Sequence, residues 1–335
     1  MTKRPTIADV ARAAGVSTAV VSYTLNGRPG VSESTRKRVL RVAEEYGWRP
    51  SAAARSLRSA PRIVGLILPA DGGTLGGEDR LLRFVAALQS AVRERGIGVL
   101  LHVADDDHAA VRVFRDWWAE RQVYAVVVPD VRRDDVRLER LAEIGVPAVA
   151  LDGSPDAATP SVWADETATF ARLATYLTSL GHRRLARVTA GGDLTAAPAR
   201  GAALAAAAAR AGGEVVTVEV TGAAGAAAAI HRLLQAERRP TAIVCDDAAA
   251  ATSALDIARR LGVEVPWEVS LVSAVDSARC GMVTPSITAL SRDCEAYGAA
   301  AGALLLHILD GHPTTSREVP TPVLRLRGST GPAAR

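Results

Sequence analysis

The chain has 335 residues, of which 48% are apolar, and its formal net charge at pH 7 is +4. That length and apolar content suffice for two or three compact units with their own cores, which excludes a disordered protein. The first sixty residues carry two Lys and nine Arg against one Asp and three Glu, a net charge of +7, which leaves −3 for the rest. A basic segment on a weakly acidic body indicates that one module contacts a polyanion, although a solvated basic surface gives the same charge pattern.

The cysteines and the N-terminal residues restrict the compartment. The sequence has three cysteines, Cys245, Cys280 and Cys294, and no two of them are spaced as CxxC. An odd number of cysteines without such a pair predicts buried thiols in a reducing environment and no metal or redox role. The first residues, MTKRPTIADVARAAG, have no apolar stretch before a cleavage site, and no apolar run approaches the roughly 18 residues of a spanning helix. We therefore expect a cytoplasmic protein.

Three short helices are predicted in the first fifty residues. Thr6 followed by Asp9 has the pattern of an N-terminal cap, and Gly15 permits a sharp reversal after the first helix. Ser17 can cap the second helix, and Ser32 begins the third. Two helices joined by a tight glycine turn form a helix-turn-helix unit, in which the second helix enters the major groove of DNA. The alternative is a small helical bundle with another function.

The second helix decides what such a unit contacts. Its predicted inner face consists of Val20, Val21 and Leu25, which recur at helical spacing. Small and polar side chains are left to point outward, and these are Thr18, Ala19, Ser22 and Tyr23.

From Arg62 onward, short β-branched or leucine-rich runs alternate with helical patterns. The first set of predicted strands is 62–69, 99–105, 125–130 and 147–152, and the second is 183–190, 214–220, 241–247 and 270–275. Alternation of strands and helices predicts doubly wound α/β layers with parallel sheets. Two such sets indicate two lobes with a cleft between them.

An enzymatic function has no positive support in the sequence. The segment DGGTLGG at 71–77 is not GxGxxG, and no GxxxxGK[ST] motif occurs. Asp105, Asp106 and Asp107 with His108 could suggest a metal site, but such a run is more typical of a solvated turn. The six histidines form no HExxH motif. We expect no catalysis, no metal ion and no cofactor.

The N-terminal segment carries a resemblance to a known family. The motifs ADVAxxAGVS, VS…LN, VS…TRxxV and P…AxxL stand at the separations found in the lactose-repressor (LacI/GalR) family of bacterial transcription regulators. The similarity extends over essentially the whole chain. It implies an all-α helix-turn-helix DNA-binding domain followed by a two-lobed α/β domain that resembles the type I periplasmic binding proteins.

The resemblance also implies domain boundaries. The helix-turn-helix domain is expected at 1–49, a hinge helix or linker at 50–61, and an effector-binding and dimerisation domain at 62–330. Because the chain of such a fold crosses between its lobes three times, lobe one is expected at 62–162 and 292–320, and lobe two at 163–291 and 321–330. The tail STGPAAR is predicted to be loose.

By the same resemblance, the second helix contacts base edges and its neighbours contact phosphates. The implied DNA-binding residues are Thr6, Ser17, Thr18, Ala19, Ser22, Tyr23, Asn26, Thr35, Arg36, Ser51, Arg55, Leu57 and Arg58. Thr18, Ala19 and Tyr23 are expected on bases. In relatives the linker folds when two copies meet on DNA, and a leucine at the position of Leu57 enters the minor groove. The alternative is that Leu57 covers a lobe surface.

The implied effector pocket lies between the lobes at the carboxyl ends of the strands. Its carried-over residues are Asp152, Trp163, Arg200, Asp247, Asp276 and Arg292, each of which could instead belong to a surface or interlobe ion pair, or to packing at a crossover. The sequence departs from the family where CDDAAAA replaces ANDxMA, SAVD replaces GxDD and DGGTLGG replaces an NPFF-type segment. Several polar and aromatic partners of a sugar are thus missing, which indicates an unusual effector or none.

The sequence therefore predicts a DNA-binding transcriptional regulator, in the first instance a repressor. It is expected to bind a palindromic operator as a homodimer and to respond to a sugar or another polar metabolite in the cleft. A dimer is favoured because no leucine heptads follow the last strand. The alternatives are a regulator of this class without a small-molecule effector, and a cytoplasmic solute-binding α/β protein.

Overall fold

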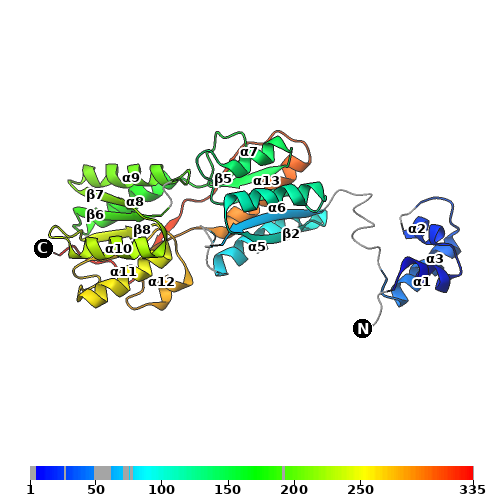
Figure 1. Ribbon diagram of the computed structural model, residues 1–335, viewed down its shortest axis with the longest axis horizontal. Helices are drawn as coiled ribbons and strands as arrows, with labels where there is room; N and C mark the ends of the chain where they lie inside the picture. Colours follow the sequence, from blue (N-terminus) through cyan, green and yellow to red (C-terminus); the bar gives the residue numbers. More distant parts are fainter. Residues whose placement is uncertain are drawn as a thin grey trace. The chain divides into compact units, whose positions relative to one another are not determined.

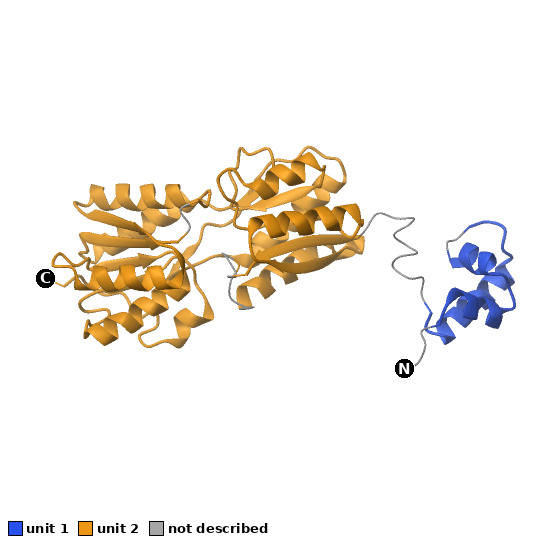
Figure 2. Cartoon of the chain, in the orientation of Figure 1, with its two compact units in different colours: residues 1–61 blue, residues 62–335 orange. Residues whose placement is uncertain are grey.

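The computed structural model describes residues 5–25, 28–48, 62–70, 75, 78–190 and 193–334. The chain forms two compact units, residues 1–61 and 62–335 (Figure 2). The expected hinge and five of the expected DNA contacts lie outside the described residues, namely Asn26, Ser51, Arg55, Leu57 and Arg58. Among the residues that are described, no helix has both the length and the apolar character needed to cross a membrane.

The first unit contains the three predicted helices. They are α1 (Ile7–Ala14), α2 (Thr18–Leu25) and α3 (Glu33–Glu45). Thr6 and Asp9 form a reciprocal capping box at the start of α1, and Gly15 ends that helix with a φ of 63°. The small core consists of Val10, Ala11, Ala14, Val21, Val39, Val42 and Ala43.

The inner face of α2 differs from its prediction. Val21 and Thr24 are buried, whereas Val20 and Leu25 are only partly buried. Leu25 still packs against the small core, and Thr24 is buried on the same side of the helix, where its carbonyl accepts a hydrogen bond of 3.0 Å from Nη1 of Arg36. The apolar pattern missed Thr24 because it gives a threonine no place on the inner face.

The second unit begins with a six-stranded sheet in the order β11-β5-β4-β3-β1-β2, and every neighbouring pair is parallel. Its strands are β1 (Ile63–Pro69), β2 (Gly98–Ala104), β3 (Ala125–Val128), β4 (Ala148–Leu151), β5 (Ser161–Trp163) and β11 (Arg317–Glu318). Helices α5 (Glu78–Val92) and α13 (Cys294–Leu309) pack on one face, and α6 (Asp107–Ala119) and α7 (Val136–Glu143) on the other (Figure 1). A short 3-10 turn, η2 (Arg93–Arg95), follows α5. We call this layered body lobe one.

Lobe two has the sheet order β12-β10-β9-β8-β6-β7. Its strands are β6 (Arg184–Thr189), β7 (Glu214–Glu219), β8 (Ala242–Cys245), β9 (Ser270–Ser273), β10 (Thr288–Ser291) and β12 (Val323–Arg325). Only β12 is antiparallel to its neighbour among these described strands. Helices α8 (Glu166–Ser179) and α9 (Ala197–Arg210) cover one face, and α10 (Gly222–Gln235), α11 (Ala248–Leu261) and α12 (Ala278–Met282) the other. Parallel sheets with helices on both faces confirm the predicted fold class.

The chain passes between the two sheets three times. It does so after β5, after β10 and after β11, because α13 and β11 return to lobe one and β12 ends in lobe two. Each lobe is therefore built from segments far apart in the sequence, and residues after the carboxyl ends of β4 and β10 come within contact of each other.

The C-terminal tail is fixed on lobe two, so the prediction of a loose tail is wrong. The carbonyl of Ser329 accepts a bond of 2.8 Å from Leu271 N, and Ala333 N donates to the Leu180 carbonyl at 2.8 Å. The Ser329 side chain is fully buried and accepts from Thr288 N at 2.8 Å. The small polar residues that resemble a flexible end are needed here, because they pair with backbone groups of lobe two.

His182 fastens the same tail and makes the stability of this lobe depend on pH. Its Nδ1 lies 2.9 Å from Thr241 Oγ1 and its Nε2 lies 3.1 Å from the Gly331 carbonyl, inside the fold. Burial lowers the pKa of His182 by more than the hydrogen bond to Gly331 raises it, so the native state favours the neutral ring. At pH values below the ordinary histidine pKa of 6.5, His182 binds a proton in the unfolded chain more readily than in the folded chain.

We therefore expect the free energy of unfolding to fall as the pH drops below about 6.5, by up to about 1.4 kcal/mol per pH unit for this one proton. Urea unfolding of the full chain at several pH values measures the slope. His182→Gln should flatten it, whereas His231→Gln, at an exposed histidine, should keep the wild-type slope. Equal slopes in both variants would contradict the role of His182.

Candidate DNA interface and effector pocket

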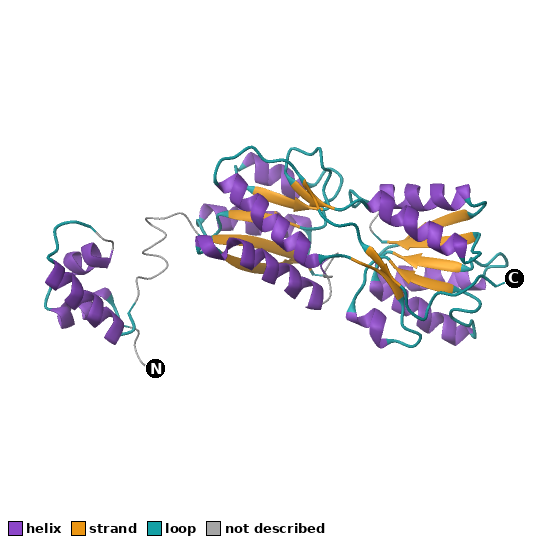
Figure 3. Ribbon diagram, turned by 180° about the vertical axis from the view of Figure 1, so that it is seen from behind, coloured by secondary structure: helices purple, strands orange, loops and turns teal. Residues whose placement is uncertain are grey.

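Helix α2 presents an unpacked face. Thr18, Ala19 and Tyr23 are exposed, with 43% of Tyr23 accessible, and Ser22 is half-buried. Ser17 caps the helix, since its Oγ accepts a bond of 3.3 Å from Val20 N. In Figure 3 the first unit consists of helices joined by loops, without a strand among its described residues. The exposed side chains are thus carried on a rigid, capped helix, and none of them belongs to the core of the unit.

Arg28 joins this surface, although no motif in the sequence pointed to it. Its guanidinium lies over the Tyr23 ring, 5.7 Å from the centroid, and its backbone N donates to the Tyr23 carbonyl at 2.9 Å. The contact depends on the course of the chain after α2, which residue spacing does not reveal. It places a cation beside an exposed aromatic ring and so adds positive charge next to the face that is expected to read DNA.

In addition to the expected phosphate contact, Arg36 has a structural role within the first unit. Its Nη1 and Nη2 donate to the carbonyls of Thr24 and Arg28 at 3.0 and 2.8 Å. A cation on free carbonyls at the end of a helix is favourable, and here it fixes α3 against the end of α2. Arg36 therefore positions the exposed face of α2.

Two other expected phosphate contacts also have internal partners. The Thr6 hydroxyl donates to Asp9 Oδ2 at 2.6 Å within the capping box. The Thr35 hydroxyl oxygen accepts a bond of 2.9 Å from Ser32 Oγ. Both hydroxyls can still accept or donate further bonds, but the structure uses them first to start α1 and α3.

The second site begins with Asp152, which follows the carboxyl end of β4. Its backbone is left-handed, with a φ of 58°, and its carboxylate forms an ion pair with Nη1 of Arg292 just after β10. Asp152 Oδ1 also accepts a hydrogen bond of 2.7 Å from the Tyr297 hydroxyl. Tyr297 reaches the site from the first turn of α13 and was not anticipated from the sequence.

The Asp152–Arg292 ion pair is extended by two further ion pairs. Arg292 Nη2 lies 2.6 Å from Glu166 Oε1, and Arg200 Nε lies 3.1 Å from Glu166 Oε2. Glu166, from the first turn of α8, was not anticipated either. We call Asp152, Arg292, Glu166 and Arg200 the cleft network. Its four side chains are at most 12% exposed, and its two acids balance its two guanidinium groups.

The cleft network fixes its own charge states. Burial raises the pKa of Asp152, but the charge of Arg292 and the Tyr297 hydrogen bond outweigh that effect and hold it below its ordinary value. Burial likewise lowers the pKa of Arg292, and Asp152 more than reverses this. Burial raises the pKa of the Tyr297 hydroxyl, which therefore remains a hydrogen-bond donor. The pair stays ionised and the tyrosine neutral near pH 7.

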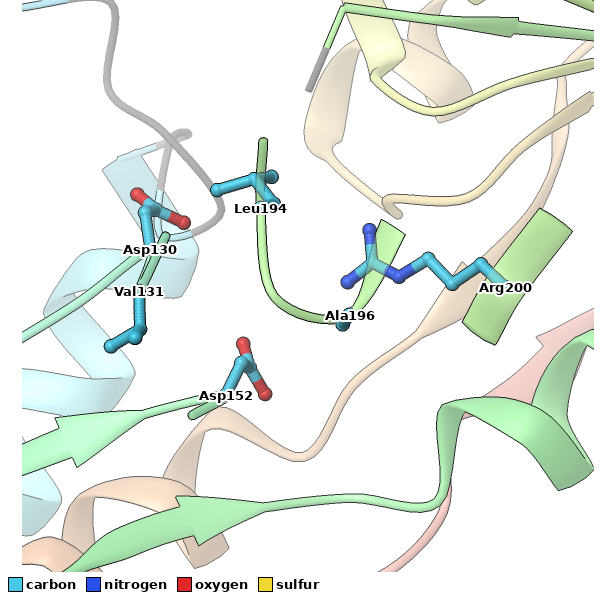
Figure 4. Close-up of a pocket in the computed structure, with 6 residues that line it drawn as sticks. All are labelled: Asp130, Val131, Asp152, Leu194, Ala196 and Arg200. Atoms are coloured by element: carbon cyan, nitrogen blue, oxygen red, sulfur yellow. The ribbon is translucent and has the colours of Figure 1, made fainter. Parts of the chain in front are cut away.

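Beside the cleft network lies a small pocket between the lobes (Figure 4). Its empty space, including the part open to solvent, is about 200 Å³. The lining residues are Asp130, Val131, Asp152, Leu194, Ala196 and Arg200. Carboxylates accept hydrogen bonds and a guanidinium donates them, so the lining residues can pair with hydroxyl groups. None of the lining residues offers an aromatic face for stacking a sugar ring.

The remaining expected effector residues are not part of this lining. Asp247 caps α11 by accepting a bond of 2.7 Å from Ala250 N. Asp276 pairs with Arg327 at 2.8 Å. Trp163 is half-buried in β5. The structure thus brings Asp152, Arg200 and Arg292 together and leaves the other three outside.

Two residues of the acidic run at 105–108 have partners in lobe one. Asp106 caps α6 by accepting a bond of 2.6 Å from Ala109 N, and Asp107 lies 2.9 Å from Arg132 Nε. Within the described part of the chain, no three His, Cys, Asp or Glu side chains form a group that could hold a metal ion.

Comparisons with known proteins agree with both units. Residues 6–51 match the family model described as bacterial regulatory proteins, lacI family, and residues 174–330 match a periplasmic binding protein-like domain. The HTH-type transcriptional regulator MalR of Streptomyces coelicolor is 31% identical over 98% of this chain and 97% of its own length.

Two solved structures extend the comparison. A complex of the transcriptional regulator CelR with cellobiose is 26% identical, has a TM-score of 0.71, and covers 97% of this chain and 100% of its own. The lac repressor dimer bound to operator and an anti-inducer is 22% identical with a TM-score of 0.82, over 98% and 100% of the two chains. The similarity to the lac repressor structure shows that the two chains share a fold.

Proposed function

The chain belongs to the lacI family of bacterial regulatory proteins, and from that premise we propose that it represses transcription by binding a palindromic operator as a homodimer in the cytoplasm. It is a DNA-binding transcriptional regulator, as the sequence predicted. We propose further that a small polar molecule in the pocket between the lobes modulates the binding of DNA.

One observation carries the DNA-binding role. Thr18, Ala19 and Tyr23 are exposed on a capped helix whose other face is buried, and Arg28 and Arg36 surround its C-terminal end. Side chains that contribute nothing to the core and stand on a rigid helix are suited to reading base edges. The alanine and the single tyrosine hydroxyl favour contact with a thymine methyl group and with one polar base edge.

The homodimer is supported by an apolar surface on lobe one. Strand β2 is the last in its sheet, and Leu101 and Val103 are 44% and 59% exposed on the side of α5, where Leu82 is 67% exposed. An exposed edge strand with apolar side chains is costly in water unless another surface covers it. A second copy would cover this patch, and a symmetric pair of chains matches the symmetry of a palindromic operator.

The pocket favours a small uncharged effector with hydroxyl groups. Asp130 and Asp152 can accept hydrogen bonds from hydroxyls, and Arg200 can donate them. A charged ligand would disturb the balance of the cleft network, whereas a neutral one would not. The similar CelR structure holds cellobiose, which supports a sugar or sugar-like molecule for this chain.

Selection of DNA from a random duplex library tests the proposal. We expect the full chain to enrich one palindromic sequence, with affinity that falls steeply as salt rises because counterions are released. Val103→Glu should disrupt the dimer and enrich only half-sites, whereas Val323→Glu, at an exposed residue of edge strand β12, should select the wild-type palindrome. Absence of any enriched sequence would overturn the assignment.

A further inference from the structure

The two lobes are joined by backbone contacts beside the pocket. Arg133 N donates to the Asp193 carbonyl at 2.9 Å, and Thr195 N donates to the Val131 carbonyl at 2.9 Å. Between these bonds, Arg132 and Leu194 form an antiparallel β-bridge. We call residues 131–133 of lobe one and 193–195 of lobe two the interlobe clasp.

An ion pair reinforces the clasp. Arg132 Nη1 lies 2.5 Å from Asp193 Oδ2 in the opposite lobe, while its Nε lies 2.9 Å from Asp107 Oδ2 in its own lobe. The contact with Asp107 thus positions the Arg132 side chain for its pair with Asp193. The side chains of Arg132 and Asp193 are 37% and 57% exposed, so the pair is accessible to water and salt.

The lobe-one half of the clasp is held rigidly from within. Asp135 accepts bonds of 2.9 Å from the backbone N of Arg132 and of Arg137, and it pairs with Arg137 Nη2 at 2.7 Å. The same Nη2 donates to the Asp130 carbonyl at 2.9 Å. Both members of the Asp135–Arg137 pair are buried. This segment therefore keeps its shape whether or not lobe two is engaged.

The lobe-two half is anchored in a comparable way. Ala197 N donates to the Leu194 carbonyl at 3.0 Å, and the Ala197 carbonyl accepts a bond of 3.1 Å from Arg187 Nη1. Arg187 is buried and forms a two-pronged pair with Asp246 at 2.9 and 2.5 Å. Gly201 leaves room for that guanidinium, because a Cβ there would lie 2.8 Å from Arg187 Nη1.

Left-handed backbone conformations are concentrated next to the interlobe clasp. Four of the described non-glycine residues have a positive φ, and three of them border the clasp or the pocket: Asp130 at 53°, Asp134 at 52° and Asp152 at 58°. The left-handed conformation costs energy for residues other than glycine and persists where the surrounding structure enforces it. Aspartate adopts this conformation more readily than most residues, and the three positions mark sharp changes of chain direction next to the clasp and the pocket.

The clasp forms part of the pocket. Val131 and Leu194, one from each half, both line it (Figure 4). Separation of the lobes at this point would break the two backbone hydrogen bonds and move Val131 away from Leu194. The pocket would then open.

We propose that the interlobe clasp is a latch that closes the pocket, and that the Arg132–Asp193 ion pair sets how readily it opens. A few polar contacts hold it, and they are bonds that water can replace, so the closed and open arrangements can lie close in free energy. A pocket ligand that touches Val131 and Leu194 would favour the closed arrangement. This inference rests on the proposed function, since it gives the pocket a means of passing its occupancy to the whole molecule.

The test measures the distance between the lobes and needs neither DNA nor effector. Spin labels are placed by Arg112→Cys on α6 and Arg232→Cys on α10, both exposed, while the described native cysteines are buried. Double electron-electron resonance on the full-length labelled chain should show a dominant short distance. In the Arg132→Asp variant, the new carboxylate lies next to Asp193 and Asp107 and is repelled by both. The distribution of distances between the spin labels should therefore shift to longer values.

Three further variants make the result specific. Arg132→Asp combined with Asp193→Arg restores a pair of opposite sign and should recover the short distance. Arg132→Gln, which removes the pair without repulsion, should give a smaller shift in the same direction. Arg140→Asp makes the same charge change at an exposed pair within lobe one and should leave the distribution unchanged.

An unchanged distribution in Arg132→Asp would overturn the latch, and so would a shift that the Asp193→Arg partner fails to reverse. Neither result bears on DNA binding, so the latch can fail while the proposed function stands. Conversely, a chain that selects no DNA sequence but opens in Arg132→Asp would refute the proposed function and leave the latch in place.

Discussion

Ala19→Asp is expected to abolish specific DNA binding, with operator affinity reduced by roughly 100-fold or more, because a like charge placed against phosphates costs several kcal/mol. Ala19 is exposed on the outward face of α2, between the cap residue Ser17 and Tyr23. A carboxylate there would face the phosphate backbone and the acceptor atoms of the bases. Fluorescence anisotropy with the selected palindrome, at fixed salt, measures the loss.

The fold should survive this change. An acidic residue in the first turn of a helix is favourable to the helix dipole, and Ala19 makes no core contact. Ala19→Asn, of nearly the same size but uncharged, should cost much less affinity than the aspartate. Wild-type affinity in Ala19→Asp would show that α2 does not face DNA.

Asp152→Asn is expected to destabilise the second unit by about 3–5 kcal/mol, because it leaves the buried guanidinium of Arg292 without one of its two carboxylate partners. Asparagine accepts the left-handed backbone of this position better than alanine does, so the substitution separates the loss of charge from backbone strain. Urea unfolding of the full chain, followed by circular dichroism, gives the change in free energy.

Two controls distinguish a broken buried pair from a general loss of contacts. Asp152→Asn combined with Arg292→Met removes both charges and leaves Glu166 paired with Arg200, so it should cost less than Asp152→Asn by itself. Glu143→Ala breaks the exposed pair with Arg140 and should change stability by less than about 1 kcal/mol. A double variant less stable than Asp152→Asn would argue against an unpaired charge as the cause.

The two sites differ in how far spacing along the chain can predict them. In the first unit, the capping box, the glycine turn and the exposed face of α2 depend on residues three or four positions apart, and their prediction from the sequence was direct. The tertiary structure added Arg28 beside Tyr23 and gave Arg36 two carbonyl partners. Both contacts require the chain to return on itself after α2.

The residues of the pocket and the cleft network were harder to predict from the sequence than those of the first unit. The resemblance pointed to Asp152, Arg200 and Arg292, which the structure brings into one network. It did not point to Glu166 or Tyr297, which complete that network, nor to Asp130, which lines the pocket. Glu166 and Tyr297 have partners 126 and 145 residues away in the chain, so no local pattern marks them.

What the sequence determined by itself was the order of helices and strands, the parallel class of the sheets, and the identity of a basic helical module. These follow from local periodicity, caps and charge, which act over a few residues. What only the tertiary structure decided was which charges meet in the cleft, how the interlobe clasp joins the lobes, and that the tail around Ser329 is fixed. Those features depend on three passages of the chain between the lobes, and buried charges find partners only after the passages have brought distant segments together.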